Sequence, residues 1–389
     1  MSALRGFRQA PWAKYVLPVT ALVAAALFPF FRPPLDGFLD DCILALIYIT
    51  MALGLNLIVG FAGLLDLGYV AFYAFGALVV GWWASDHFTG VNDEEGIHIG
   101  VSEFASSLPG IHVNFLILII GAILVCALAG AVIGLPTLRL RGDYIAIVTL
   151  AFGEIIGRFA ANGDEVTVFG DYAFSNGRES ISPLDQIDLP FLEQFDSATN
   201  LRPYYWTMLA IVVVTLVVNL RLRDSRLGRA WIALREDEVA AASMGVPLVK
   251  TKLAAYATGG ALGGAAGCFY GAYLNSVNAN QFQFGFSIFI LAMVILGGLG
   301  SIWGVVIGAV ALAFVNNRLI PDVLDQGAIN DLKTDLGLEF TFNEVAFGIF
   351  GFVLVLMMVL RPEGLLPERR RQIELTEGTG DESVFETRI

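Results

Sequence analysis

The stretch SRLGRAWIALREDEVAAASMGVP, residues 225–247, is a polar segment rich in Arg, Glu and Ala that lies between two hydrophobic runs. Ser225, or the aspartate before it, can cap the start of a first helix, because short polar side chains accept hydrogen bonds from free backbone N–H groups. Asp237 can cap a second, shorter helix that ends at Gly245, with Pro247 just beyond it. The sequence therefore predicts a compact pair of short helices on a membrane surface.

The rest of the chain is strongly apolar. Of its 389 residues, 56% are hydrophobic and 15% are charged, whereas a soluble domain carries about 25% charged residues. Several runs approach or exceed the roughly 18 apolar residues that mark a membrane-spanning helix. Glycine is abundant, with 42 residues, and small residues three or four apart allow helices to pack closely in lipid. These features predict an all-α, polytopic membrane protein.

The hydrophobic runs predict about ten transmembrane helices. The fifth and eighth runs are short, so we expect these helices to be tilted, broken or partly re-entrant. The first run resembles a signal peptide, but Phe, Arg and Pro follow its apolar core in place of a small-residue cleavage site, so we interpret it as a retained span. The predicted spans are residues 15–31, 42–60, 63–84, 113–135, 143–158, 204–220, 252–274, 285–299, 301–320 and 343–360.

Lys and Arg residues fall on alternate connectors between these spans. Under the positive-inside rule, their distribution places both termini in the cytoplasm with an even number of crossings. The other connectors are acidic and hold much of the net charge of -13; they either dock a soluble partner or simply keep the loops solvated. We expect a cytoplasmic N-terminus at 1–14, a transmembrane domain at 15–360 with an acidic external loop at 159–203, and a disordered cytoplasmic tail at 361–389.

The sequence contains none of the nucleotide-binding or catalytic motifs for which we searched. It contains no P-loop for nucleotide phosphates, no zinc-protease motif and no nucleophile elbow. Its three cysteines lie in hydrophobic segments and form no CxxC pair, so no metal site is predicted. His87, His98 and His112 lie in or beside one acidic loop, where we expect them to be solvated. The chain is therefore not predicted to be an enzyme or to bind a cofactor itself.

Four segments, in this order, carry a family resemblance: ALGLNLIVGFAGLLDLGYVAFYAFGAL (52–78), LRLRGDYIAIVTLAFGEII (138–156), GRAWIALREDEVAAASMGV (228–246) and AMVILGGLGSIWGVVIGA (292–309). Together they resemble the larger permease subunit of branched-chain amino-acid ABC importers. The chain departs from the family's Gly-rich pattern at residues 165–180. The resemblance implies a fold similar to type II ABC importers and a pore formed with a homologous second permease. It also implies two P-loop ATPase subunits that bind ATP and Mg²⁺, and a periplasmic substrate-binding protein.

In that family, the segment matching residues 228–246 is the coupling element that a groove of the ATPase receives. The residue types here suit this role. The small alanine side chains keep the helices narrow, and Arg and Glu can form polar contacts at the edge of the interface. The alternative is an amphipathic helix on lipid headgroups, anchored by Trp231, although the acidic REDE run weakens attraction to anionic lipid. The predicted coupling residues are Gly228, Arg229, Ala233, Arg235, Glu236, Asp237, Ala241 and Gly245.

Polar residues within the predicted spans are candidates for the translocation path, because such residues are costly in lipid. Asp66 and Glu154 either face the path, where they could contact a passing ammonium group, or lie at span ends. Tyr69 and Tyr73 either line an apolar passage or pack helices together. Asn56 is a path candidate or a hydrogen-bonding residue between helices. The candidates are Asn56, Asp66, Tyr69, Tyr73, Tyr144 and Glu154.

The predicted function is the transmembrane permease of an ATP-driven importer in a bacterial or archaeal-type inner membrane. Its expected cargo is branched-chain amino acids delivered by the binding protein. One alternative keeps the architecture and carries urea, short amides or other amino acids. Another is an ion-coupled secondary transporter, which should show paired ionisable residues at broken helices in two repeats. The lipid bilayer is an expected partner and nucleic acid is not.

Overall fold

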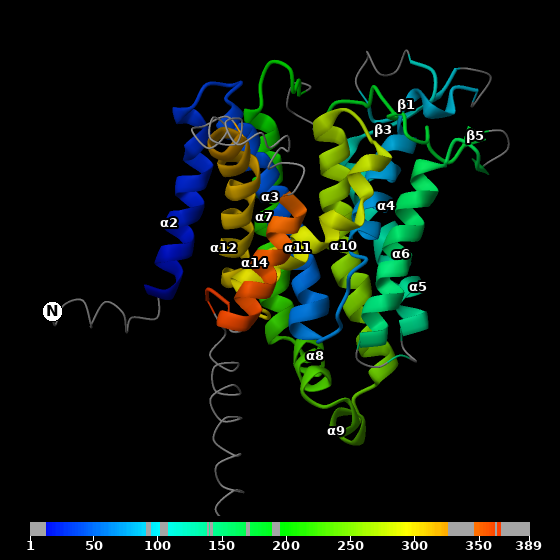
Figure 1. Ribbon diagram of the computed structural model, residues 1–389. Coiled ribbons are helices and arrows are strands. Elements are labelled where there is room, and N and C mark those ends of the chain that lie inside the picture. Colours follow the sequence, from blue (N-terminus) through cyan, green and yellow to red (C-terminus); the bar gives the residue numbers. More distant parts are fainter. Residues whose placement is uncertain are drawn as a thin grey trace, which may run out of the picture.

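The computed structural model describes residues 13–90, 95–101, 108–137, 140, 143–168, 172–188, 195–325, 346–361 and 364–366. Long helices lie side by side as a bundle, with short strands at one end and two short helices at the other (Figure 1). We name these ends the loop end and the coupling end, the second after the coupling element that the family resemblance implies. The predicted N-terminal segment 1–14 and tail 361–389 fall almost entirely outside the described residues.

Helices form because the apolar runs satisfy their backbone hydrogen bonds internally, which lipid requires. One half of the chain supplies α2 (Ala13–Leu27), a 3₁₀ turn η1 (Phe28–Phe31), α3 (Gly37–Asn56), a π-helical turn η2 (Leu57–Phe61), α4 (Val70–Trp83), α5 (Phe115–Thr137) and α6 (Asp143–Ala161). The other half supplies α7 (Arg202–Asp224), α8 (Arg226–Glu236), α9 (Glu238–Ser243), α10 (Leu248–Leu274), η5 (Ala279–Phe282), α11 (Phe284–Gly297), α12 (Ile302–Phe314), η6 (Val315–Asp325) and α14 (Ala346–Leu360). A short 3₁₀ turn, η3 (Asp86–Phe88), lies at the loop end.

The chain is mostly helical, as predicted. Five helical segments are long and apolar enough to cross a membrane: Gly37–Phe61, Phe115–Thr137, Tyr144–Ala161, Arg202–Asp224 and Ile302–Pro321. Shorter apolar helices occur at Thr20–Phe31, Val70–Trp83, Phe284–Gly297 and Phe350–Leu360. Each predicted span overlaps a described helix, but the count of ten crossings stays a prediction.

Helix α10 occupies the centre of the bundle, where it packs against α3, α4 and α5. Glycines permit this close approach. A Cβ atom added at Gly76 of α4 would overlap the carbonyl oxygen of Gly264, and one added at Gly264 would overlap Cys126 of α5. Small residues therefore bring three helix backbones together, as the glycine-rich composition predicts for packing in lipid.

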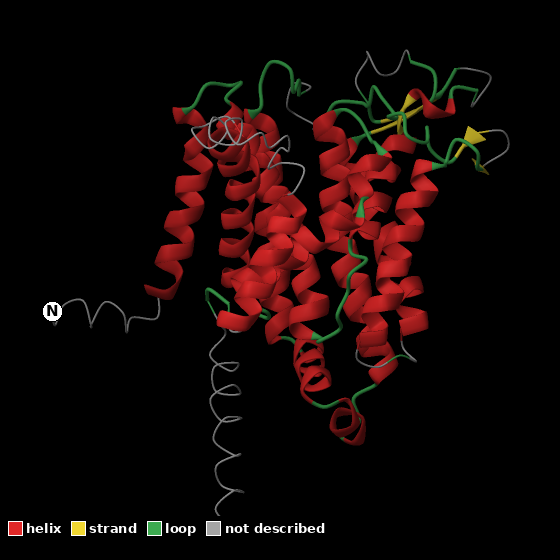
Figure 2. Ribbon diagram, viewed as in Figure 1, coloured by secondary structure: helices red, strands yellow, loops and turns green. Residues whose placement is uncertain are grey.

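Short strands at the loop end were not predicted by the all-α expectation. β3 (Ile111–Val113) pairs antiparallel with β1 (Ala84–Ser85) and parallel with β2 (Ile97–Ile99). β4 (Thr167–Val168) pairs antiparallel with β5 (Tyr172–Ala173). Figure 2 shows these strands in yellow above the helices. They hold parts of the acidic connectors in a defined shape.

The third predicted span, 63–84, begins with a helix break. Residues 62–69 follow η2 without regular helical structure, and α4 begins only at Val70. In Figure 2 this stretch is drawn as a loop that rises between the helices. Gly63 adopts a positive φ of 69°, which favours glycine. Irregular backbone within a bundle of this kind is tolerated where protein buries it or where it lines a cavity.

Candidate functional site

The coupling end is formed by α8 and α9, and local sequence determines both helices. The Ser225 side chain accepts a hydrogen bond from the backbone N–H of Gly228 at 3.1 Å. Asp237 accepts from the N–H groups of Val239 and Ala240 at 2.7 and 2.9 Å. Both caps satisfy N–H groups that a helix start leaves free. The predicted pair of capped helices is therefore present, and it projects beyond the bundle (Figure 1).

Gly228 sets the sharp turn between α7 and α8. A Cβ atom at this position would overlap the carbonyl oxygens of Leu222 and Arg223 at the end of α7. The α8 backbone thus lies directly against the preceding helix. Any larger side chain would displace α8 from α7.

The base of the helix pair is fixed to α10. Trp231 is fully buried, and its indole N–H donates to the carbonyl oxygen of Thr251 at 2.9 Å. The ammonium group of Lys252, itself buried, lies 2.7 Å from the Glu238 carboxylate. Trp231 therefore packs inside the protein, and its expected alternative role as an interfacial lipid anchor is wrong.

Arg235 points inward rather than outward. Its guanidinium donates to the carbonyl oxygen of Gly60 at 2.7 Å, and its aliphatic stem packs against Gly63. Arg235 thus joins α8 to the end of η2, where the 62–69 break begins. Its side chain is partly exposed, and a rim contact to a partner stays a prediction.

The exposed tip of the pair is partly apolar. Val239 is 64% exposed and Met244 is 86% exposed. Sequence reasoning missed both residues, although an apolar side chain on a short capped polar helix was an available signal. Of the predicted coupling residues, Arg229, Glu236, Asp237 and Gly245 are exposed, Ala233 and Arg235 are partly buried, and Gly228 and Ala241 are buried.

Two of the translocation-path candidates lie at the helix break or just before it. Asn56, the last residue of α3, accepts a hydrogen bond from the backbone N–H of Gly300 at 2.9 Å. Asp66 is buried, and one carboxylate oxygen accepts from the N–H of Gly68 at 2.8 Å. The other has no hydrogen-bond partner among the described residues. The break also bonds to α6, since the Leu67 N–H donates to the Thr149 hydroxyl at 3.0 Å.

Tyr69 and Tyr73 are fully buried and pack helices together. The Tyr69 hydroxyl donates to the carbonyl oxygen of Gly259 on α10 at 2.9 Å. The ring of Tyr73 lies 5.3 Å from that of Phe286 and 5.5 Å from that of Tyr270, centroid to centroid. Both side chains therefore act in helix packing in this conformation.

Tyr144 lies at the start of α6, and Glu154 lies in the second half of the same helix. Tyr144 is 69% exposed, and it heads a stripe of exposed apolar residues that continues through Ile147 and Ile155. Glu154 forms an ion pair with Arg158, one helical turn away, at 3.4 Å. An exposed helix face that mixes apolar and charged residues is unusual against lipid.

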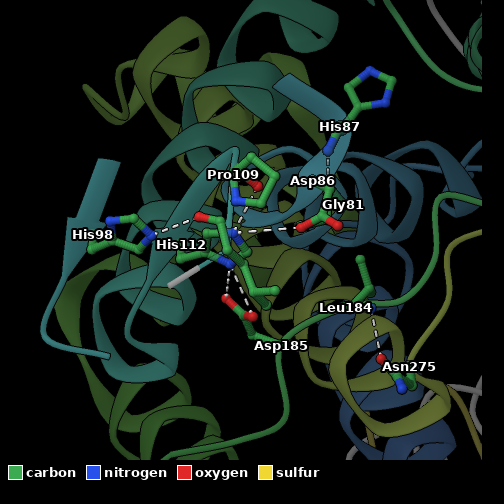
Figure 3. Close-up of polar contacts among 11 residues, drawn as sticks. Gly81, Asp86, His87, His98, Pro109, His112, Leu184, Asp185 and Asn275 are labelled. Carbon is green, nitrogen blue, oxygen red and sulfur yellow. Dashed lines mark hydrogen bonds and ion pairs between the residues drawn. The ribbon is translucent and has the colours of Figure 1, made fainter. Parts of the chain in front are cut away.

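The loop end holds a contact between a buried histidine and a partly buried carboxylate (Figure 3). The His112 ring is buried, and its Nδ1 lies 2.8 Å from Asp185. Its Nε2 lies 3.1 Å from the carbonyl oxygen of Pro109 and 3.5 Å from Asp86. Burial lowers the pKa of His112, but the hydrogen bond to Asp185 and the carboxylate charges outweigh it, so the pKa is raised overall.

The other two histidines also make hydrogen bonds. A ring nitrogen of His87 lies 2.8 Å from the carbonyl oxygen of Ala173, and one of His98 lies 2.9 Å from that of Leu108. The expectation of solvated loop histidines is therefore wrong for His112, which is buried, while His87 and His98 are partly exposed. Within the described ranges, no group of three or more His, Cys, Asp or Glu side chains could hold a metal ion.

Comparison with known proteins finds relatives among transport permeases. Residues 39–359 match the family described as branched-chain amino acid transport system / permease component. The chain is 35% identical to the high-affinity branched-chain amino acid transport system permease protein LivM of Escherichia coli, over 96% of this chain and 83% of that protein. It is 26% identical to a probable LivM of Methanocaldococcus jannaschii, over 83% and 91%.

A second permease of the same kind of system is also similar. The E. coli branched-chain amino acid permease protein LivH is 28% identical over 173 residues, which cover 44% of this chain and 48% of that protein. No solved structure matches the chain. The resemblance that the four sequence segments carry is thus confirmed.

Proposed function

We propose, on the premise that the chain belongs to the family of branched-chain amino acid transport system permease components, that it is the larger permease subunit of an ATP-driven importer. The chain is a transport permease and not an enzyme. Its cargo is branched-chain amino acids, the substrates named for its relatives. Its place is the inner membrane, with both termini in the cytoplasm.

The observation that carries this proposal is the α8–α9 pair at the coupling end. Its base is fixed by Trp231 and Lys252, while Val239 and Met244 are exposed at its tip. A rigid helical projection with an apolar tip suits insertion into a groove of a soluble subunit. Since the sequence contains no P-loop, ATP and Mg²⁺ would be bound by two separate ATPase subunits that receive this pair.

A second, homologous permease would complete the pore. Similarity to both LivM and LivH supports such a pair of permeases. The exposed stripe of α6 is the face best suited to it, because Glu154 and Arg158 at its loop-end half are costly against lipid. We therefore place the shared path along α6, with Tyr144 at the start of the helix and Glu154 in its loop-end half.

The helix break offers a mechanical link to that path. Arg235 connects α8 to Gly60, and the following residues carry Asp66 and contact Thr149 on α6. When ATP binding moves the coupling pair, the break would shift with it and change the packing of α6. Alternating access would then follow from a rigid-body rearrangement of the two permeases.

The periplasmic binding protein would dock at the loop end. The acidic connectors there provide charge for steering a partner, and the His112–Asp185 pair links β3 to the segment after β5. A connector held in a defined shape costs less ordering on binding than a mobile one.

Reconstituted transport tests the proposed function. The complete complex in proteoliposomes, with ATP inside and binding protein outside, should accumulate radiolabelled leucine. Uptake should stop without ATP and persist when ionophores collapse ion gradients. Uptake driven by an ion gradient without ATP would contradict the proposal and favour a secondary transporter. Uptake of urea but not leucine would contradict the proposed substrate and leave the ATP-driven import unchanged.

A further inference from the structure

The loop-end half of α6 borders a polar cavity of about 510 Å³. One helix face contributes Glu154, Gly157 and Arg158, and the far side comes from Arg178 and from residues of η5 and the start of α11. Ligand pockets in proteins span roughly 300–1,000 Å³. The cavity is therefore large enough for a small solute.

The charges around the cavity are complementary to a zwitterion. Arg158 contacts Glu154 through its Nε atom at 3.4 Å. This leaves the two terminal guanidinium nitrogens, which carry four of its five N–H donors, for another partner. Arg178 is exposed, and no ion pair of its side chain occurs among the described residues. Two guanidinium groups suit a carboxylate, since Arg binds carboxylates through parallel hydrogen bonds.

The opposite charge and an apolar surface are also present. Glu154 contacts Arg158 through one carboxylate oxygen, so the other can accept hydrogen bonds from an ammonium group. Ala161, Phe282 and Phe284 line the same cavity and offer contact to an aliphatic side chain. Close packing fixes the wall, because a Cβ atom at Gly157 would lie 2.9 Å from the carbonyl oxygen of Phe282.

We propose that this cavity is a transient binding site for a zwitterionic α-amino acid with an aliphatic side chain, at the loop-end entrance of the path along α6. The carboxylate lies between Arg158 and Arg178, and the ammonium group lies at Glu154. This site rests on the proposed function, which brings the amino acid to the loop end. It adds a selective step in the permease itself, after release from the binding protein.

Protection of an introduced thiol tests the site in the complete complex. Asn280 is exposed and lines the cavity, so an Asn280→Cys variant can be labelled with a membrane-impermeant maleimide. Leucine at ten times its dissociation constant should slow labelling about tenfold. The complex without this substitution measures labelling of the native cysteines, of which Cys126 and Cys268 are buried.

Two arginine substitutions then test the recognition. Adding R158Q and R178Q to the thiol variant should weaken leucine protection at least about tenfold, because charge-assisted hydrogen bonds are lost. Glu179→Gln, next to Arg178 but outside the cavity, should leave protection unchanged, as should R32Q, an arginine bonded to Asp36 instead. Added phosphatidylethanolamine, a zwitterionic lipid, should not slow labelling of the introduced thiol.

The outcomes separate this inference from the proposed function. If the complex imports leucine with ATP but leucine never slows labelling, the site is wrong and the function stands. Protection that survives R158Q and R178Q, or that lipid alone produces, also overturns the site. If the complex fails to import leucine at all, the proposed function and the amino-acid ligand are both wrong.

Discussion

A complex carrying V239D and M244D should lose its ATPase subunits during purification. Both side chains are exposed at the tip of α9, and the proposed groove would bury them. Placing unpaired charges in such a contact removes apolar burial and adds a desolvation cost. Hot-spot side chains contribute about 2 kcal/mol or more each, so the double variant should weaken binding roughly a thousandfold. Co-purification stoichiometry and titration with purified ATPase measure this.

The control introduces two aspartates at exposed apolar positions of the loop end. Ile97 and Ile99 are exposed on β2, so I97D with I99D changes charge and apolar surface equally but leaves the coupling end intact. This control should keep its ATPase. Thermal unfolding should be similar in both variants, because none of the four side chains is buried. Retention of the ATPase by the V239D and M244D variant would contradict docking at α9.

Replacing Arg235 with alanine should separate ATP hydrolysis from transport. The guanidinium bonds to Gly60 rather than facing the tip, so the ATPase should still assemble and hydrolyse ATP. Loss of a hydrogen bond to a charged group costs about 1.5–3 kcal/mol, which predicts a roughly 10- to 100-fold drop in leucine imported per ATP hydrolysed. Parallel assays of phosphate release and uptake in proteoliposomes measure this ratio.

Arg226 provides the matched control on the same helix. Its side chain is exposed at the start of α8, and it makes no described contact with the break. Arg226→Ala should therefore keep transport and hydrolysis coupled. Equal losses in both variants, or full coupling in Arg235→Ala, would show that the Gly60 contact does not transmit motion.

Local signals predicted the coupling pair well. Ser225, Asp237 and Gly245 act through their own backbone neighbours, so the helix boundaries follow from a few adjacent residues. The burial of Trp231 could not be predicted in the same way. It depends on the start of α10, 20 residues later in the chain, and an isolated amphipathic helix looks the same whether protein or lipid covers it.

Non-local contacts also explain the errors at the helix break and the loop end. The 63–84 run is apolar enough for a helix, but a hydrogen bond to Thr149 and packing of the Arg235 stem against Gly63 hold its first residues in another conformation. The strands are two or three residues long, and pairing of β2 with β3 joins segments separated along the chain. Runs this short carry too little period-two pattern to indicate a strand.

The most direct measurement is a cross-link from the tip of α9. A thiol introduced by Met244→Cys in the complete complex should react, through a short bifunctional maleimide, with a cysteine on the surface of the ATPase groove. The chain without a substitution measures cross-linking through its own three cysteines. Ile99→Cys measures cross-linking from the loop end. Docking of the ATPase at α9 predicts a permease–ATPase product from Met244→Cys alone. Absence of that product from an assembled, transporting complex, or an equal product from Ile99→Cys, would contradict it.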